Sequence, residues 1–169
     1  MRALFDFDKK NYPPDAVPVV RPSVRAIVIR ENRVWMVKSL KYGFYKFPGG
    51  GMELGETHED TLIREAREEA GLVIKKESIR PYGSVRRVEK GKGLNEVFVQ
   101  DNFYYFASAE ETLRPQQLDA YEQEDQFFPV LTDARTAITA NRACPRGHGM
   151  LEREARVLEM LVKEKFLPE

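Results

Sequence analysis

A glycine run that leads into an acidic helix is the feature of this sequence that most restricts how the chain folds. The stretch from Pro48 to Leu72 reads PGGGMELGETHEDTLIREAREEAGL. Thr57 is a good N-cap with Asp60 three residues later, and Gly71 suits the C-terminal end of a helix. We therefore expect a helix between Thr57 and Gly71, preceded by a loop whose glycines allow close approach of other groups.

The expected helix carries three carboxylates beside an apolar stripe. With about 100° between successive residues, Glu65, Glu68 and Glu69 share an arc of roughly 100° and should face out of the core. Carboxylates packed this closely repel one another unless a cation neutralises them. Hard oxygen ligands of this kind suit Mg²⁺ or Mn²⁺, which also bridge protein carboxylates to phosphates. The adjacent arc of the helix is apolar and should face the core; it holds Leu62, Ile63, Ala66 and Ala70.

A plain solvated helix is the competing interpretation of these residues. Helices rich in Glu and Arg are common, and Arg64 and Glu68 form an ordinary i,i+4 pair. Two neighbouring features favour the metal site instead. The glycines at positions 49–51 lie just ahead of the helix, and Glu56 stands directly before the N-cap, from where it could turn back towards the cluster.

The same stretch resembles the Nudix box, G-x5-E-x7-R-E-U-x-E-E-x-G-U, in which U is a bulky aliphatic residue. Ala66 stands at one aliphatic position, a change that concerns packing rather than chemistry. The flanking strands and a closing helix extend the resemblance over residues 19–167. The matching positions of the motif are Gly50, Glu56, Arg64, Glu65, Glu68, Glu69, Gly71 and Leu72.

The resemblance implies a single α/β domain over residues 19–167, with residues 1–18 as an N-terminal arm. The fold of the family is an α/β/α sandwich with a mixed β-sheet. Its members are hydrolases that typically cleave the diphosphate of a nucleoside diphosphate linked to another group. A MutT-like pyrophosphatase is therefore the expected activity.

The resemblance also implies roles for the residues of the motif. Mg²⁺ or Mn²⁺ would be held by Glu56, Glu65, Glu68 and Glu69. The general base would be Glu65 or Glu68, and the sequence does not choose between them. Arg64 would serve catalysis by orienting the glutamates through ion pairs, while Gly50 and Gly51 would contribute backbone to substrate binding. Family members often recruit a further carboxylate from a late loop, where this chain has Glu122, Glu124 and Asp125.

The substrate is less restricted than the reaction. ADP-ribose hydrolases of the family often carry a proline shortly after the motif, where this chain has Arg87-Val88-Glu89. We find no marker of the dinucleoside polyphosphate or coenzyme A types either. The default expectation is a nucleoside triphosphate, ordinary or modified. The alternatives are ADP-ribose, a dinucleoside polyphosphate, the 5′ end of an RNA, which the zero net charge disfavours, and a nucleotide-binding domain without catalysis.

A short aromatic strand, Phe44–Phe47, leads into the glycine loop. Alternation along a strand sends Tyr45 to the face opposite Phe44, so that one ring packs in the core and the other borders the substrate. We assign Tyr45 to the substrate side, where it could stack on a base.

The remaining patterns predict a mixed α/β chain. Strands are expected from Ser23, at Val34–Val37, Tyr82–Val88, Glu96–Ala107 and Phe127–Leu131, with a tight turn at Glu31–Asn32. Helices are expected near Asp133–Ala140 and over Met150–Phe166. Residues 1–20 read as irregular apart from a short strand at Leu4–Phe7, and residues 109–126 read as a loop.

Charge and cysteine content limit the partners and the compartment. The 27 basic residues balance the 27 Asp and Glu residues, so no overall field attracts nucleic acid or an anionic membrane. Cys144 is the only cysteine, and the charged N-terminus lacks the apolar run of a secretory signal. We expect a cytoplasmic protein whose partner is a small nucleotide, and leave open whether two copies form a homodimer.

Overall fold

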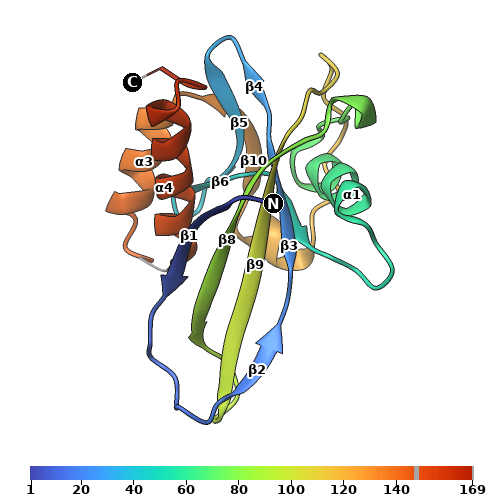
Figure 1. Cartoon of the computed structure of the whole chain (residues 1–169). Coiled ribbons are helices and arrows are strands. Elements are labelled where there is room, and N and C mark those ends of the chain that lie inside the picture. The colour runs from blue at the N-terminus through green and yellow to red at the C-terminus, as the bar shows by residue number, and fades with distance from the viewer. Residues whose placement is uncertain (147–148, 169) are drawn as a thin grey trace.

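Two β-sheets with helices on both sides make up the fold (Figure 1). The computed structural model describes residues 1–146 and 149–168. The larger sheet has the order β1-β8-β9-β3-β7, with β2 also paired to β9. It is mixed, because the pairs β1–β8, β2–β9 and β3–β9 are parallel while β8–β9 and β3–β7 are antiparallel. Its strands are β1 (Ala3–Asp8), β2 (Val17–Val20), β3 (Ser23–Ile27), β7 (Gly49–Gly51), β8 (Arg80–Lys90) and β9 (Glu96–Phe106).

The smaller sheet is antiparallel and has the order β10-β5-β4, with β6 also paired to β5. Its strands are β4 (Ile29–Arg30), β5 (Arg33–Ser39), β6 (Tyr45–Lys46) and β10 (Phe127–Thr132). The turn between β4 and β5 is the one predicted. Glu31 and Asn32 both have positive φ, at 50° and 59°, as a two-residue hairpin turn requires.

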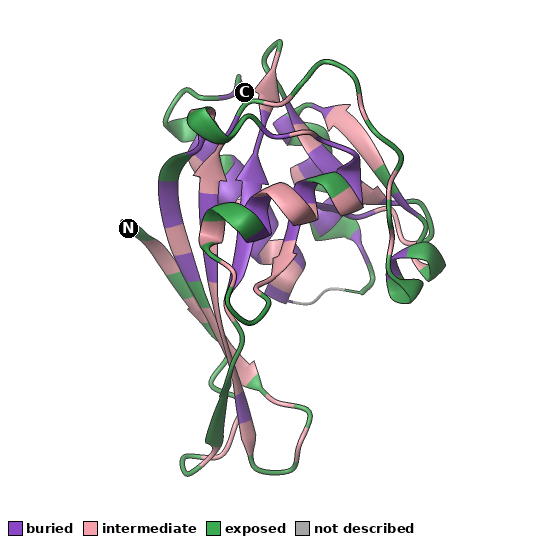
Figure 2. Ribbon diagram, turned by 90° about the vertical axis from the view of Figure 1, so that its right-hand side faces the viewer, coloured by how far each residue is buried: buried purple, intermediate pink, exposed green. Residues whose placement is uncertain are grey.

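The helices are α1 (His58–Ala70), α2 (Ala120–Glu124), α3 (Ala134–Ala143) and α4 (Gly149–Lys163), with a 3₁₀ turn at Lys76–Ser78. In Figure 1, α1 covers one side of the sheets and the α3–α4 pair covers the other. The predicted α/β/α sandwich with a mixed sheet is confirmed. Buried side chains fill both layers, as the purple segments of Figure 2 show.

The helix predicted from the acidic stretch is confirmed, together with both of its ends. The Thr57 hydroxyl accepts a hydrogen bond from the Asp60 amide at 3.2 Å, and the Asp60 carboxylate accepts one from the Thr57 amide at 3.1 Å. Gly71 closes the helix with φ of 65°. Leu62 and Ala66 are fully buried, so the apolar stripe faces the core as expected.

The N-terminal segment is more regular than its sequence suggests. The expected strand near Leu4–Phe7 is β1, and residues 17–20 form the unexpected strand β2. All four residues of β2 are exposed. Their sequence, Val-Pro-Val-Val, has no alternation of apolar and polar side chains that would predict a strand. Figure 2 shows this end of the larger sheet extending beyond the helices. The expected boundary between an arm and a domain at residue 18 falls inside β2 and stays a prediction.

Two further elements differ from expectation in length or kind. The short helix α2 lies within residues 109–126, which read as a loop because acidic residues and few apolar ones surround it. The closing helix ends at Lys163 rather than Phe166, since Lys165 adopts a positive φ of 64° that the helix cannot continue through.

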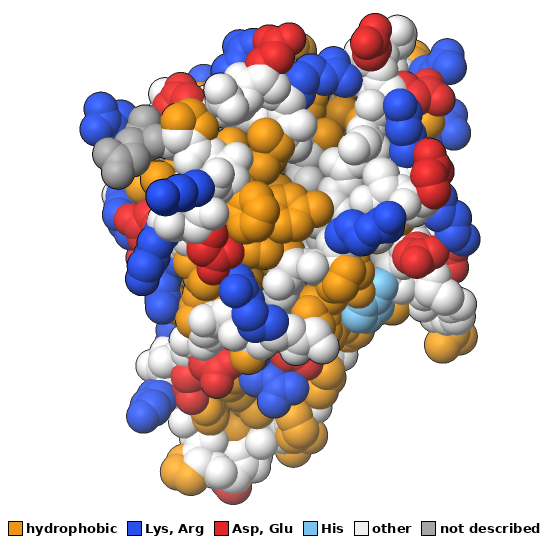
Figure 3. Space-filling view, turned by 45° about the horizontal axis from the view of Figure 1, so that its top comes forward, with side chains coloured by type: hydrophobic (Ala, Val, Ile, Leu, Met, Phe, Trp, Pro, Cys, Tyr) orange, Lys and Arg blue, Asp and Glu red, His pale blue; other side chains and the backbone are white. Residues whose placement is uncertain are grey.

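Charges are mixed on the surface. Figure 3 shows basic and acidic side chains interspersed around a patch of hydrophobic ones, with no broad area of one sign on that face. Across the described residues, no helix has both the length and the apolar character needed to cross a bilayer.

Candidate functional site

Arg64 lies at the centre of the acidic cluster. Its Nε and Nη2 atoms donate to the two oxygens of Glu56 at 2.6 and 2.9 Å, a two-point ion pair. Its Nη1 atom donates to Glu65 at 2.8 Å and to Glu68 at 3.2 Å. One guanidinium therefore gathers three of the predicted carboxylates, the geometry expected of a residue that orients them.

The carboxylates around Arg64 differ in electrostatic environment. Hydrogen bonds from the Arg64 guanidinium lower the pKa of Glu56 to about 2. Burial raises the pKa of Glu65, although its ion pair with Arg64 opposes the shift. Arg64 thus holds Glu56, one of the expected metal ligands, in its charged form, whereas burial disfavours the charged form of Glu65.

The glycine run, expected as a loop, forms strand β7, which pairs with β3. We keep the name glycine loop for residues 48–51, and this segment packs directly against the side chains around Arg64. A Cβ atom on Gly50 would lie 2.4 Å from the Glu65 carboxylate, so only glycine allows this approach. The Gly51 carbonyl accepts a hydrogen bond from Arg64 at 3.3 Å. The motif positions Gly50 and Gly51 are therefore brought together with the acidic helix, as the sequence predicts.

A cavity of about 310 Å³ opens between α1, the glycine loop and the segment around α2. Of the predicted site residues, it is lined by Gly50, Gly51, Arg64, Glu65 and Glu68. It is also lined by residues that the sequence did not single out as substrate contacts: Arg21, Gln117, Asp119 and Tyr121. These come from outside the motif, and no local pattern marks them.

Glu69 corrects one expectation. It does not face out of the core, because the residue is only 1% exposed. Its carboxylate forms an ion pair with the ammonium of Lys46, which is itself buried on β6, and accepts a hydrogen bond from the Gly49 amide at 2.9 Å. A buried counter-charge from a distant strand draws this glutamate inward and turns it towards the backbone of the glycine loop.

Tyr45 corrects another. It is 6% exposed and packs in the core layer that holds Phe47 and Leu158, away from the cavity. The side chain of Asn141 binds both the amide and the carbonyl of Tyr45, at 2.7 and 2.9 Å. Phe44 is buried in the other core layer. Both rings are therefore part of the core, and neither lines the acidic cavity.

Of the three late carboxylates that the sequence offered, Glu122, Glu124 and Asp125, only Glu122 lines the cavity. Burial raises its pKa, and so does the neighbouring carboxylate of Glu69. Glu124 instead pairs with Lys41 at 2.7 Å, and Asp125 pairs with Arg146 at 3.0 Å. The structure thus separates one cavity carboxylate from two surface ion pairs.

The donor set suits a hard divalent cation, because the cavity presents carboxylate oxygens from Glu65, Glu68 and Glu122. A bound cation would also favour the charged form of Glu65, which burial disfavours. As the side chains stand, the described residues include no group of three acidic, histidine or cysteine side chains close enough to hold one ion. Arg64 and Lys46 occupy positions beside the carboxylates and neutralise part of their charge.

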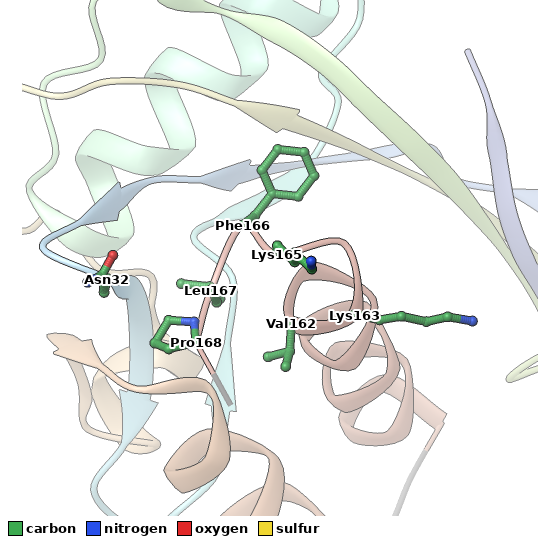
Figure 4. A pocket seen from close by; sticks show the side chains of 7 residues that line it. All are labelled: Asn32, Val162, Lys163, Lys165, Phe166, Leu167 and Pro168. Atoms are coloured by element: carbon green, nitrogen blue, oxygen red, sulfur yellow. The ribbon is translucent and has the colours of Figure 1, made fainter.

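A larger hollow, about 560 Å³, lies at the C-terminal end of α4 (Figure 4). Its charged lining residues are Lys163 and Lys165, and Figure 4 shows the Lys163 side chain extending away from Asn32. None of its lining residues is acidic, so it offers no ligands for Mg²⁺. The acidic cavity is the better candidate site despite its smaller volume.

The family model of the NUDIX domain matches residues 19–141. The chain belongs to the Nudix family. Its fold resembles a solved Nudix hydrolase from Nitrosomonas europaea, with a TM-score of 0.60 and 12% identity over 84% of this chain and 90% of the other. A MutT structure from work on Aliivibrio salmonicida and Vibrio cholerae gives a TM-score of 0.55 and 15% identity, over 86% and 99% of the two chains. At these identities the likeness is one of fold.

Two curated relatives match shorter segments of the chain. An ADP-ribose pyrophosphatase from Methanocaldococcus jannaschii is 34% identical over 98 residues, which cover 56% of this chain and 57% of the relative. An RNA pyrophosphohydrolase from Acinetobacter baylyi is 43% identical over 54 residues, which cover 31% of this chain and 32% of the relative. The matches thus span about half and about a third of these relatives.

Glu69→Gln should destabilise the protein far more than Glu68→Gln. Removing the Glu69 charge leaves Lys46 buried without its ion-pair partner, at a cost of about 3 kcal/mol. The Glu68 side chain is 35% exposed and its ion pair with Arg64 is worth about 1 kcal/mol or less. Urea denaturation of both variants and the wild type measures the difference. Equal unfolding free energies for the two variants would show that the Lys46–Glu69 pair is not structural.

Proposed function

We propose that the protein is a metal-dependent Nudix pyrophosphohydrolase that cleaves the diphosphate of a nucleoside diphosphate linked to another group. The observation that carries the proposal is the shared cavity of Glu65, Glu68 and the Gly50–Gly51 backbone, gathered around Arg64. An ordinary solvated helix would expose its acidic face to water, whereas part of this face is buried against the glycine loop. The matched family supports the same reaction.

Glu65, Glu68 and Glu122 are the residues that would hold Mg²⁺ or Mn²⁺ in this cavity. When bound, the cation neutralises the diphosphate and lowers the pKa of the attacking water. Arg64 and Glu56 keep Glu65 and Glu68 in place. Glu65 or Glu68 would act as the general base, since both carboxylates line the cavity. Glu69 would hold the glycine loop in place, because its carboxylate accepts a hydrogen bond from the Gly49 amide.

Two substrates are supported by different observations. ADP-ribose is favoured by the 34% identical relative, which is named for cleaving it. A nucleoside triphosphate remains the choice of the sequence argument, since no marker of the other classes is present. Both carry the same diphosphate unit, and the cavity chemistry described above acts on that unit alone.

A substrate panel with and without chelator tests the proposal. The purified chain is incubated with ADP-ribose, nucleoside triphosphates and a dinucleoside polyphosphate in Mg²⁺, and the released products are identified. We expect turnover of at least one of them, and its loss in excess EDTA, because the clustered carboxylates then repel the phosphates. Turnover that persists in EDTA would contradict the metal dependence, and no turnover of any compound would contradict the enzyme assignment.

The nucleoside end of the substrate is assigned to the Tyr121 side of the cavity. Tyr121 is 57% exposed, its hydroxyl donates to Glu122 at 2.8 Å, and its ring forms part of the cavity lining. Arg21 also lines the cavity and forms no ion pair within the part of the chain that the structure describes, so we expect it to bind a phosphate. The cavity therefore combines an exposed ring and a cation without an ion pair with its carboxylates.

Tyr121→Ala should raise KM for the best substrate by roughly tenfold, the loss expected when a stacked base loses its aromatic partner. The effect on kcat should be smaller, because the reacting groups are untouched. Tyr121→Phe should keep most of the affinity, and Phe128→Ala, which removes another exposed ring, serves as the control. If KM is the same in Tyr121→Ala and Phe128→Ala, the base binds elsewhere.

A further inference from the structure

The glycine loop pairs with β3 through its strand β7, and it is also held by side chains, two of which lie outside the Nudix motif. Besides Glu69 on the Gly49 amide, the Arg25 guanidinium of β3 donates to the Gly49 carbonyl. The amide of Phe47, two residues earlier, donates to the carboxylate of Glu154 at 2.9 Å. Glu154 lies on α4, beyond the residues that the family model matches.

Glu154 is one half of a buried ion pair. Its neighbour Arg153 donates to Glu154 Oε1 through Nε at 3.0 Å and through Nη2 as well. Both residues are 0% exposed. The Tyr104 hydroxyl donates to the same carboxylate oxygen at 3.3 Å, so the second oxygen, Oε2, is the one that receives the Phe47 amide.

Arg153 is fixed from the opposite direction. Its Nη1 atom donates to the Asn102 side chain at 2.6 Å and to the Gln100 side chain at 3.3 Å, both on β9. The Ser23 hydroxyl of β3 donates to the same Asn102 oxygen at 2.8 Å. The pair is thus anchored on β9, whose Asn102 also accepts from Ser23 of β3, and it reaches the segment just before the glycine loop through the Phe47 amide.

Stability alone does not account for this arrangement. Two charges removed from water lose hydration energy, and replacing such a pair by apolar residues is often neutral or stabilising. The surrounding positions Val157, Leu158 and Leu161 already attach α4 to the core. What an apolar pair could not provide is an acceptor for the Phe47 amide.

We propose that the Arg153–Glu154 pair is a positioning element of the active site, which fixes the Phe47 amide and thereby sets the glycine loop against Glu65. The proposal rests on the pyrophosphohydrolase function above. Gly50 touches the Glu65 carboxylate, so a shift of the loop by about 1 Å changes the place of a reacting group, on a scale that can cost up to about a hundredfold in rate.

Two charge-free double variants separate positioning from stability. Arg153→Met with Glu154→Gln removes both charges but keeps an oxygen acceptor for the Phe47 amide. Arg153→Met with Glu154→Leu removes both charges and the acceptor. Both variants remove the two charges of the pair together, and both remove equally the attraction of Glu154 for the buried Arg25, so the two differ only in the acceptor for the Phe47 amide. Glu152→Gln is the matched control, because Glu152 lies on the same helix in an exposed ion pair with Arg142.

The acceptor-free variant should have a kcat at least about tenfold below that of the acceptor-keeping variant, with KM within about threefold. The Glu152→Gln control should have the kcat of the wild type. Equal kcat values in the two double variants would overturn the proposal, whatever their melting temperatures.

Amide hydrogen exchange, measured by NMR on the full chain, provides a test that needs no turnover. The Gly49 amide should exchange faster in the acceptor-free variant than in the acceptor-keeping one, because the loop is no longer held at Phe47. Equal exchange at Gly49 would overturn the positioning role. This comparison tests the positioning role even if no compound in the panel is hydrolysed. A failure of the positioning proposal can therefore be distinguished from a failure of the proposed hydrolase function.

Discussion

The ion pairs of Arg64 are the interaction on which the candidate site depends. One planar guanidinium binds Glu56 through two nitrogens and reaches Glu65 and Glu68 with a third. Glu56 precedes the helix and the other two lie on it, so these bonds tie the segment before α1 to the helix itself. A lysine would supply the charge but not the fork of donors that contacts three carboxylates at once.

The loop that faces Arg64 is held by buried charges from three elements. Glu69 of α1 and Arg25 of β3 bind the Gly49 backbone, while Glu154 of α4 binds the amide of Phe47. Each buried charge costs hydration energy, which its partners must offset. As a result, the backbone position of the loop is set before substrate arrives. Such preorganisation means that the groups of an active site need not be ordered during the reaction.

The parts of the structure that depend on neighbouring residues could be predicted from the sequence. The capping box at Thr57 and Asp60, the C-cap at Gly71 and the turn at Glu31–Asn32 all follow from contacts within a few residues. The α/β/α fold followed from the resemblance that this local pattern carries.

The parts of the structure that depend on partners distant in the sequence could not be predicted. Glu69 reads as a solvated ligand until Lys46 of β6 is placed beside it, and Tyr45 reads as half-exposed until both faces of β6 are covered. The choice of Glu122 over Glu124 depends on where a five-residue helix turns its side chains. Arg153 and Glu154 look like any charged pair on an amphipathic helix, and only the packing of α4 on β9 buries them.

Binding of Mn²⁺ to the protein without substrate, followed by electron paramagnetic resonance, is the most direct measurement of the central claim. The claim is that the carboxylates around Arg64 form a cation site. Wild-type protein should bind Mn²⁺, and Glu68→Gln should weaken binding by at least about tenfold, the scale on which changes at metal sites act. Glu159→Gln, which alters an exposed ion pair on α4, should bind as the wild type does. Equal Mn²⁺ affinity in wild type and Glu68→Gln would contradict the account.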